Sequence, residues 1–188
     1  MNTGLWLMTC FETIFILQKF IMTVELETYN TSWPDVFNIE KEMLHAAIGQ
    51  NNLVIEHIGS TAIPGLSAKP IIDIMVGLHD YAIAGELLQG MSHMGYRYMA
   101  EYEESIPDRK FFLKSSGGER SHHVHMVQLN EEYWDRHMFF RNHLRRNEIV
   151  RHAYQDLKTR LSNLDWKNRN QYALAKSAFI RAIEEKHF

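Results

Sequence analysis

This chain of 188 residues has a single cysteine and no long uninterrupted apolar run. Cys10 is the only cysteine, so no disulfide can form within the chain, and we expect a cytoplasmic protein. The most apolar stretch, residues 5–21, is interrupted by Glu12, Gln18 and Lys19. Because a membrane span needs roughly 20 predominantly apolar residues, we expect no membrane association.

No basic residue precedes that stretch, so a secretory signal is not indicated either. Because Met22 offers a second start, we interpret residues 1–21 as an N-terminal extension, either of the reading frame or as an added amphipathic helix. We expect this extension to be disordered or to pack against another chain. Residues 22–188 are long enough to form one compact domain with its own core.

The formal net charge of −3 conceals an uneven distribution. Residues 1–108 hold 4 Lys or Arg against 14 Asp or Glu, whereas residues 109–188 hold 16 against 9, which gives net charges of −10 and +7. The two parts either attract each other within the fold, or the second part offers positive charge to phosphates. Nucleic acid is not indicated, because the basic stripe Arg141, Arg145 and Arg146 lacks interleaved aromatic residues; we interpret this stripe as a solvated surface.

Two periodic patterns divide the chain. Short apolar runs bounded by turn residues predict strands at 53–58, 71–76, 96–101, 109–114 and 123–129. Three- and four-residue apolar spacing predicts helices from Ser32 to Gly49 and at 80–91, 131–146, 149–161 and 169–186. The first helix is expected to be capped by the Ser32 hydroxyl and to bury Val36, Ile39, Met43, Leu44, Ala47 and Ile48. A sheet-rich part, residues 22–130, is thus followed by a helical part, residues 131–188, in an α+β or α/β arrangement.

The most informative residues lie between the first two predicted strands. A strand that ends in Gly59 and Ser60 can bring backbone N–H groups and a hydroxyl close to phosphate oxygens, because glycine has no side chain in the way. Asp73 on the next strand can hold a hard divalent cation beside that phosphate. Lys69 can add positive charge to the site, unless it is a solvated loop lysine. Asp73 can instead simply accept hydrogen bonds within the fold, but inside an apolar strand its charge needs a partner, which favours a functional role.

Residues 57–66, HIGSTAIPGL, and residues 68–74, AKPIIDI, resemble the signature of the GrpB family, a branch of the nucleotidyltransferase superfamily with the DNA polymerase beta-like fold. The resemblance extends over about residues 28–188. It implies an α+β domain in which a nucleotidyltransferase-like mixed β-sheet is flanked by helices and followed by a C-terminal helical segment. It also implies a cleft in which Gly59, Ser60 and Thr61 hold a triphosphate, while carboxylates hold magnesium or manganese for transfer of a nucleoside monophosphate.

One position departs from the superfamily pattern. The superfamily has a second carboxylate two residues after the first, where this chain has Met75, and a thioether is a poor magnesium ligand. His123 and His125 project from one face of their strand and can compensate as metal ligands or proton-transfer groups. We predict a metal site of Asp73, His57 and His125, which would also suit zinc. The imidazoles could instead hydrogen-bond within the fold or transfer protons without a metal.

Arg109 and Lys110 flank the later strands and can clamp phosphate, although such residues are more often solvated. The first hypothesis is a nucleotidyltransferase with Asp73, His123 and His125 as catalytic residues. The second is a non-catalytic module that binds a nucleotide or another phosphorylated small molecule. The third is a helix-mediated interaction protein, and an oligomer is left open in all three.

Overall fold

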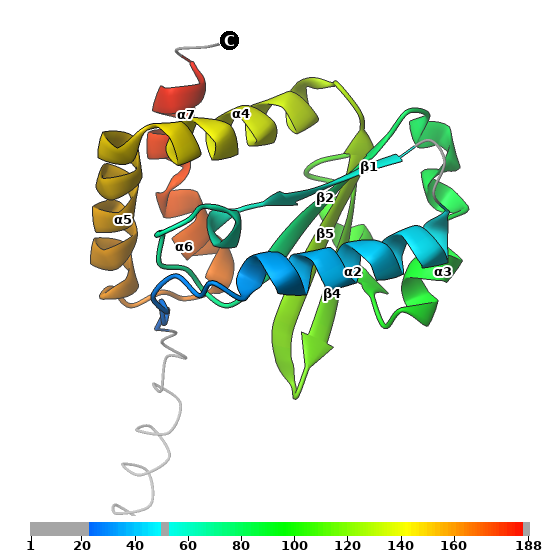
Figure 1. Ribbon diagram of the computed structural model, residues 1–188, viewed down its shortest axis with the longest axis horizontal. Helices are drawn as coiled ribbons and strands as arrows, with labels where there is room; N and C mark the ends of the chain where they lie inside the picture. The colour runs from blue at the N-terminus through cyan, green and yellow to red at the C-terminus, as the bar shows by residue number, and fades with distance from the viewer. Residues whose placement is uncertain (1–22, 50–52, 186–188) are drawn as a thin grey trace, which may run out of the picture.

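Five strands form one mixed sheet in the computed structural model, which describes residues 23–49 and 53–185 (Figure 1). Their order is β1-β2-β5-β4-β3, and only β2 and β5 pair in parallel. The strands are β1 (Leu53–Ile58), β2 (Ile72–Leu78), β3 (Arg97–Tyr98), β4 (Arg109–Ser116) and β5 (Glu119–Gln128). The expectation for residues 1–21 lies outside the described residues.

Helices cover both faces of this sheet. On one face, α2 (Trp33–Ile48) and α3 (Leu88–His93) enclose the main apolar core together with the strands. On the other face, Trp134 of α4 (Glu132–Arg146) packs with Met75. Beside the sheet stand α5 (Glu148–Ser162), α6 (Arg169–Ala175) and α7 (Ser177–Glu184) (Figure 1). The fold is therefore α+β with a helical C-terminal segment, as predicted.

None of the helices within residues 23–49 and 53–185 is long and apolar enough to cross a membrane.

The helix α2 begins and ends where the sequence predicts, and it buries Leu44 and Ile48 as predicted, but the rest of its buried stripe differs. Its buried residues are Trp33, Phe37, Glu40, Leu44 and Ile48, whereas Val36, Ile39 and Met43 are exposed. Glu40 is tolerated inside because it accepts hydrogen bonds from the Tyr96 hydroxyl at 2.9 Å and from Lys114 at 2.7 Å. The expected cap is also absent, because the Ser32 hydroxyl donates to Asn30 at 2.8 Å instead.

Three predicted elements are shorter or divided. The helix predicted at 80–91 is the 3₁₀ turn η2 (Tyr81–Gly85) followed by α3, since Gly85 and Gly90 weaken a continuous helix. The strand predicted at 96–101 is reduced to β3, and the 3₁₀ turn η3 (Ala100–Tyr102) follows it. The helix predicted at 169–186 is divided at Lys176 into α6 and α7.

The strand register decides which candidate side chains share a face. Asp73 pairs with His123, whereas His57 pairs with Ile74, the next residue along β2, so Asp73 and His57 lie on opposite faces. The face toward α4 carries Asp73, His123, His125 and Arg109, and the face toward α2 carries His57 and Lys110.

Candidate functional site

The chain turns after β1 at Gly59 and Ser60, next to Asp73 on β2. Gly59 has φ 70° and ψ −172°, a conformation that is essentially restricted to glycine. A Cβ atom on Gly59 would lie 2.3 Å from Oδ2 of Asp73, so the carboxylate packs directly against the backbone of the turn. Ser60 begins the 3₁₀ turn η1 (Ser60–Ala62), and its side chain hydrogen-bonds to Tyr154 of α5.

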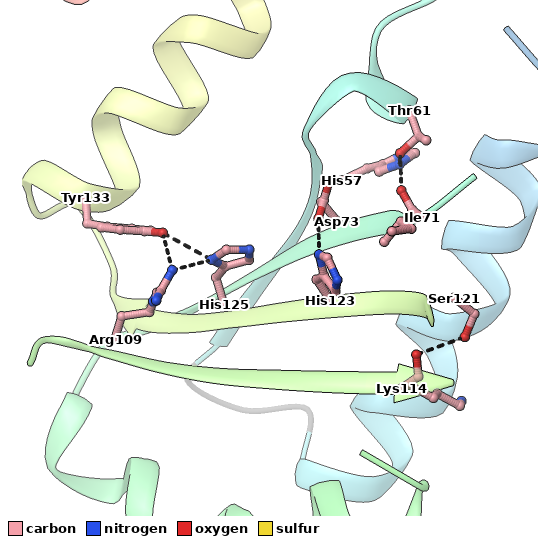
Figure 2. Close-up of polar contacts among 10 residues, drawn as sticks. All are labelled: His57, Thr61, Ile71, Asp73, Arg109, Lys114, Ser121, His123, His125 and Tyr133. Carbon is pink, nitrogen blue, oxygen red and sulfur yellow. Dashed lines mark hydrogen bonds and ion pairs between the residues drawn. The ribbon is translucent and has the colours of Figure 1, made fainter. Parts of the chain in front are cut away.

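Asp73 and His123 form a carboxylate–imidazole pair (Figure 2). Their Oδ1 and Nδ1 atoms are 2.9 Å apart, and the side chains are 28% and 18% exposed. An ionised carboxylate only accepts, so Nδ1 of His123 donates, and Nε2 is buried without a partner among the described residues. No hydrogen bond from the described residues reaches Oδ2 of Asp73. This unpaired oxygen belongs to a partly exposed side chain. We call Gly59, Ser60, Asp73 and His123 the turn site.

His57 does not join the turn site. Its ring stacks on Phe37 with 4.7 Å between centroids, and its Nε2 lies 3.0 Å from Oγ1 of Thr61. The Thr61 hydroxyl donates to the Ile71 carbonyl at 3.1 Å and therefore accepts from His57. Burial lowers the pKa of His57 to about 4, although the charge of Asp73 opposes this shift. His57 and the Thr61 hydroxyl are thus engaged within the fold.

The predicted metal ligands are not brought together. Asp73 and His57 lie on opposite faces of the sheet, and Nδ1 of His125 lies 3.1 Å from the Tyr133 hydroxyl. In the described part of the chain, no three His, Cys, Asp or Glu side chains are arranged to hold a metal ion. These residues do not fit the predicted His/Asp site. Asp73 alone remains as a carboxylate that could share a metal with the phosphates of a ligand.

Arg109 and Lys110, both predicted to bind phosphate, are separated by the pleat of β4. Arg109 points toward α4, where NH1 donates to the Tyr133 hydroxyl at 3.2 Å and lies 3.4 Å from Nδ1 of His125. Lys110 points to the other face and forms an ion pair with Glu103 at 2.8 Å. Only Arg109 shares a face with the turn site.

Two of the basic residues on α4 hold the backbone of the turn, and one of them, Arg141, is buried. Arg141 is 7% exposed, and its NH1 donates to the His57 carbonyl at 2.8 Å and to Glu56 at 2.5 Å. Nε of Arg145 donates to the Ala62 carbonyl at 2.9 Å. The expected solvated stripe is therefore wrong for Arg141, whereas Arg145 is exposed as expected although it binds η1. Together they fix the end of β1 and η1 on α4.

Two lysines, Lys158 and Lys176, resemble family landmarks in the sequence but were not predicted as site residues, and both approach the turn site. Burial lowers the pKa of Lys176 to about 8, with Asp73 opposing and Lys69 adding to the shift. Lys158 is 1% exposed and donates to the Ser67 carbonyl, and burial together with the charge of Lys176 lowers its pKa to about 7. We call Lys69, Lys158 and Lys176 the lysine cluster.

Aromatic rings position this lysine cluster. Lys69 and Lys176 lie 4.9 and 4.5 Å from the ring centroid of Tyr172, and Lys158 lies 5.3 Å from that of Tyr154. A tyrosine precedes a lysine by four residues in both cases, and this repeated spacing is the sequence signal that could have identified them. Neither Lys158 nor Lys176 has a carboxylate at ion-pair distance within residues 23–49 and 53–185.

The buried charge of Lys158 predicts an unusual dependence of stability on pH. Its pKa falls from 10.5 to about 7 on folding, so the unfolded chain binds more protons between these values and stability rises with pH across that window. Lys158→Met should reduce this rise, by up to about 1.4 kcal/mol per pH unit, in urea unfolding measured from pH 6 to about pH 10. Parallel curves for the two proteins would show that Lys158 has an ordinary pKa.

Comparison with known proteins places these features in a family. The GrpB protein family model matches residues 23–186, and the chain belongs to this family. Its similarity to the crystal structure of conserved protein GrpB from Enterococcus faecalis has a TM-score of 0.75 at 32% identity and covers 86% of this chain and 96% of that one.

Relatives of known sequence agree with this assignment. The UPF0157 protein YqkA of Bacillus subtilis is 35% identical over 162 residues, which cover 86% of this chain and 46% of YqkA. This chain therefore spans about half the length of YqkA. The glutamate-rich protein GrpB of Alkalihalophilus pseudofirmus is 30% identical over 164 residues, covering 85% of this chain and 93% of that protein.

Proposed function

We propose that this chain binds the phosphates of a nucleoside triphosphate at the turn site and transfers a nucleoside monophosphate to an acceptor. The observation that carries the proposal is a pair of lysines, the buried Lys158 and the half-buried Lys176, whose pKa values are lowered and which have no carboxylate at ion-pair distance in the described part of the chain. Burying an uncompensated cation is costly, and a bound phosphate would remove that cost. The phosphate of another phosphorylated small molecule would bind to the same lysines in the same way.

The groups present can each take a part in transfer. The acceptor hydroxyl gives its proton to Oδ2 of Asp73 while its oxygen attacks the α-phosphorus. The bond from the α-phosphorus to the bridging oxygen breaks, and its electron pair leaves with pyrophosphate, whose charge the lysine cluster neutralises. His123 holds Oδ1 at 2.9 Å and acts as a positioning residue. The requirement for magnesium, manganese or zinc stays a prediction, and no step depends on a metal held by protein ligands alone.

A nucleotide panel tests phosphate binding directly. Each of the four nucleoside triphosphates is added with and without magnesium, manganese or zinc, and the rise in melting temperature is measured, because a ligand that binds only the native state stabilises it. Lys176→Met is expected to weaken binding by about 10- to 100-fold, as expected for the loss of a charged hydrogen-bond donor. Lys167→Met, at an exposed position before α6, is the matched control and should bind like the wild type.

A measurement of pyrophosphate release distinguishes a nucleotidyltransferase from a module that binds nucleotide without turnover. A binding module without turnover is favoured by one observation, the fully buried Met75 at the position of the second carboxylate. A nucleotide-dependent rise in melting temperature without pyrophosphate release from any acceptor mixture would support that module. No thermal shift with any nucleotide and metal would remove both readings and favour a helix-mediated interaction protein.

A further inference from the structure

Arg109 is a buried guanidinium without a negatively charged partner. Its side chain lies on the α4 face of the sheet, and the residue is 9% exposed. Nε is buried with no hydrogen-bond partner, and NH1 meets only the Tyr133 hydroxyl and Nδ1 of His125. Within the described ranges, no carboxylate lies at ion-pair distance from Arg109. A charge in such a place normally has a partner, because desolvation alone is costly.

The side chains around Arg109 do not supply that negative charge. Burial first, and then the charge of Arg109, lower the pKa of His125 well below its usual value, which favours the neutral ring. Burial likewise lowers the pKa of His137, whose ring stacks on Tyr133 with 4.2 Å between centroids. Phe111 offers a ring face 4.9 Å from the guanidinium carbon. Aromatic and neutral groups thus enclose a full positive charge.

This charge lies next to the turn site along the sheet. His125 pairs with Met75, two residues beyond the pair of His123 with Asp73, so both pairs face α4. Residues two apart on a strand are separated by about 7 Å. Figure 2 shows His125 between Arg109 and Tyr133 on one side and Asp73 and His123 on the other. A small molecule held at Arg109 would therefore reach Asp73 with its far end.

We propose that Arg109 and Tyr133 form a subsite for an anionic group, a carboxylate or a phosphate, of the acceptor molecule. The guanidinium donates to this group, and the Tyr133 hydroxyl turns from His125 to donate to it as well. Because Arg109 pairs with Val127 and lies beyond His125 as seen from Asp73, the acceptor is then an acid whose hydroxyl and anionic group are more than about 7 Å apart. Its role as acceptor rests on the proposed function, whereas the binding of the anion does not.

Anion titrations of the wild type and of Arg109→Met test the subsite. Succinate represents carboxylates and inorganic phosphate represents phosphates, each compared with sodium chloride at equal ionic strength. We expect a saturable rise in melting temperature and a shift of the Arg109 Nε–H signal in NMR spectra, with affinity lost by about tenfold or more in Arg109→Met. The anion that produces both effects identifies the chemical class of the group.

Two controls separate this subsite from ordinary charge effects. Lys110→Met removes the neighbouring cation on the opposite face and should leave the anion response unchanged. Without anion, Arg109→Met should be at least as stable as the wild type, because an unpaired buried charge is removed. A destabilised Arg109→Met would identify a structural arginine and overturn the proposal. Equal anion responses in the wild type and Arg109→Met, or no response in the wild type, would also overturn the proposal.

The nucleotide response keeps this proposal distinct from the proposed function. Arg109→Met should retain the thermal shift with nucleotide, because the lysine cluster is intact, and should lose turnover only with anionic acceptors. If the wild type binds succinate or phosphate at Arg109 but no nucleotide, the subsite stands and the proposed function fails. If nucleotide binds and Arg109 shows no response to either anion, the subsite proposal fails and the proposed nucleotide binding stands.

Discussion

Asp73→Asn is expected to lower the rate of nucleotidyl transfer by about 10²- to 10⁴-fold. Asparagine preserves the size of the side chain and can still accept from His123 Nδ1, which lies 2.9 Å from Oδ1 of Asp73. It cannot take a proton from the acceptor hydroxyl. Pyrophosphate release at saturating nucleotide measures the loss, and full activity in this variant would show that Asp73 is not the base.

Matched variants show whether the loss is specific. Asp80→Asn is a suitable control, because Asp80 is exposed and asparagine can still accept the hydrogen bond from the Ala82 N–H that caps η2. His123→Gln should lower the rate and displace the pH–rate profile, because it acts through Asp73. The double variant should then be no slower than Asp73→Asn alone, since the two residues work as a unit. Additive losses would instead indicate separate roles.

The same Asp73 variant reports on the metal. Without a divalent ion, removing a negative charge beside the phosphates should tighten nucleotide binding. If magnesium is shared between Asp73 and the phosphates, the variant should bind magnesium-nucleotide less tightly than the wild type. The sign of the change in affinity thus decides whether a metal lies at Asp73.

The order of strands and helices could be predicted because its signals are local. β1 has the predicted bounds. β4 begins at the predicted residue, Arg109, and ends at Ser116, two residues after the predicted end and directly before the turn at Gly117. Of the buried stripe of α2, only Leu44 and Ile48 were predicted, because two sets of residues share helical spacing and the correct one contains Glu40. That choice depends on two residues distant in sequence: Tyr96 donates a hydrogen bond to the Glu40 carboxylate, and Lys114 neutralises its charge.

The candidate site shows the same division between local and long-range information. Alternation along a strand correctly placed His123 and His125 on one face. It could not place His57, because β1 runs antiparallel to β2 and its register with Asp73 is set by pairing rather than by composition. The spacing of Tyr154 with Lys158 and of Tyr172 with Lys176 is visible in the sequence, but their approach to the turn site is not, since it depends on how the C-terminal helices pack.

Gly59→Ala is expected to destabilise the chain and to abolish nucleotide binding. Alanine is strained at φ 70° and ψ −172°, at a cost of about 1–3 kcal/mol, and its Cβ would lie 2.3 Å from Oδ2 of Asp73. The carboxylate must then move away from the turn, and its hydrogen bond with His123 is expected to break. Urea unfolding measures the first effect, and the nucleotide-dependent shift in melting temperature measures the second.

Gly65→Ala separates backbone strain from the loss of the site. Gly65 also has a positive φ, 78°, but a Cβ there meets nothing within 4 Å, so this variant places alanine at a positive φ without touching Asp73. It should lose some stability and keep the response to nucleotide. Equal responses to nucleotide in the two variants would mean that Asp73 need not pack against Gly59 for phosphate to bind, and that the close approach of turn and carboxylate serves only the fold.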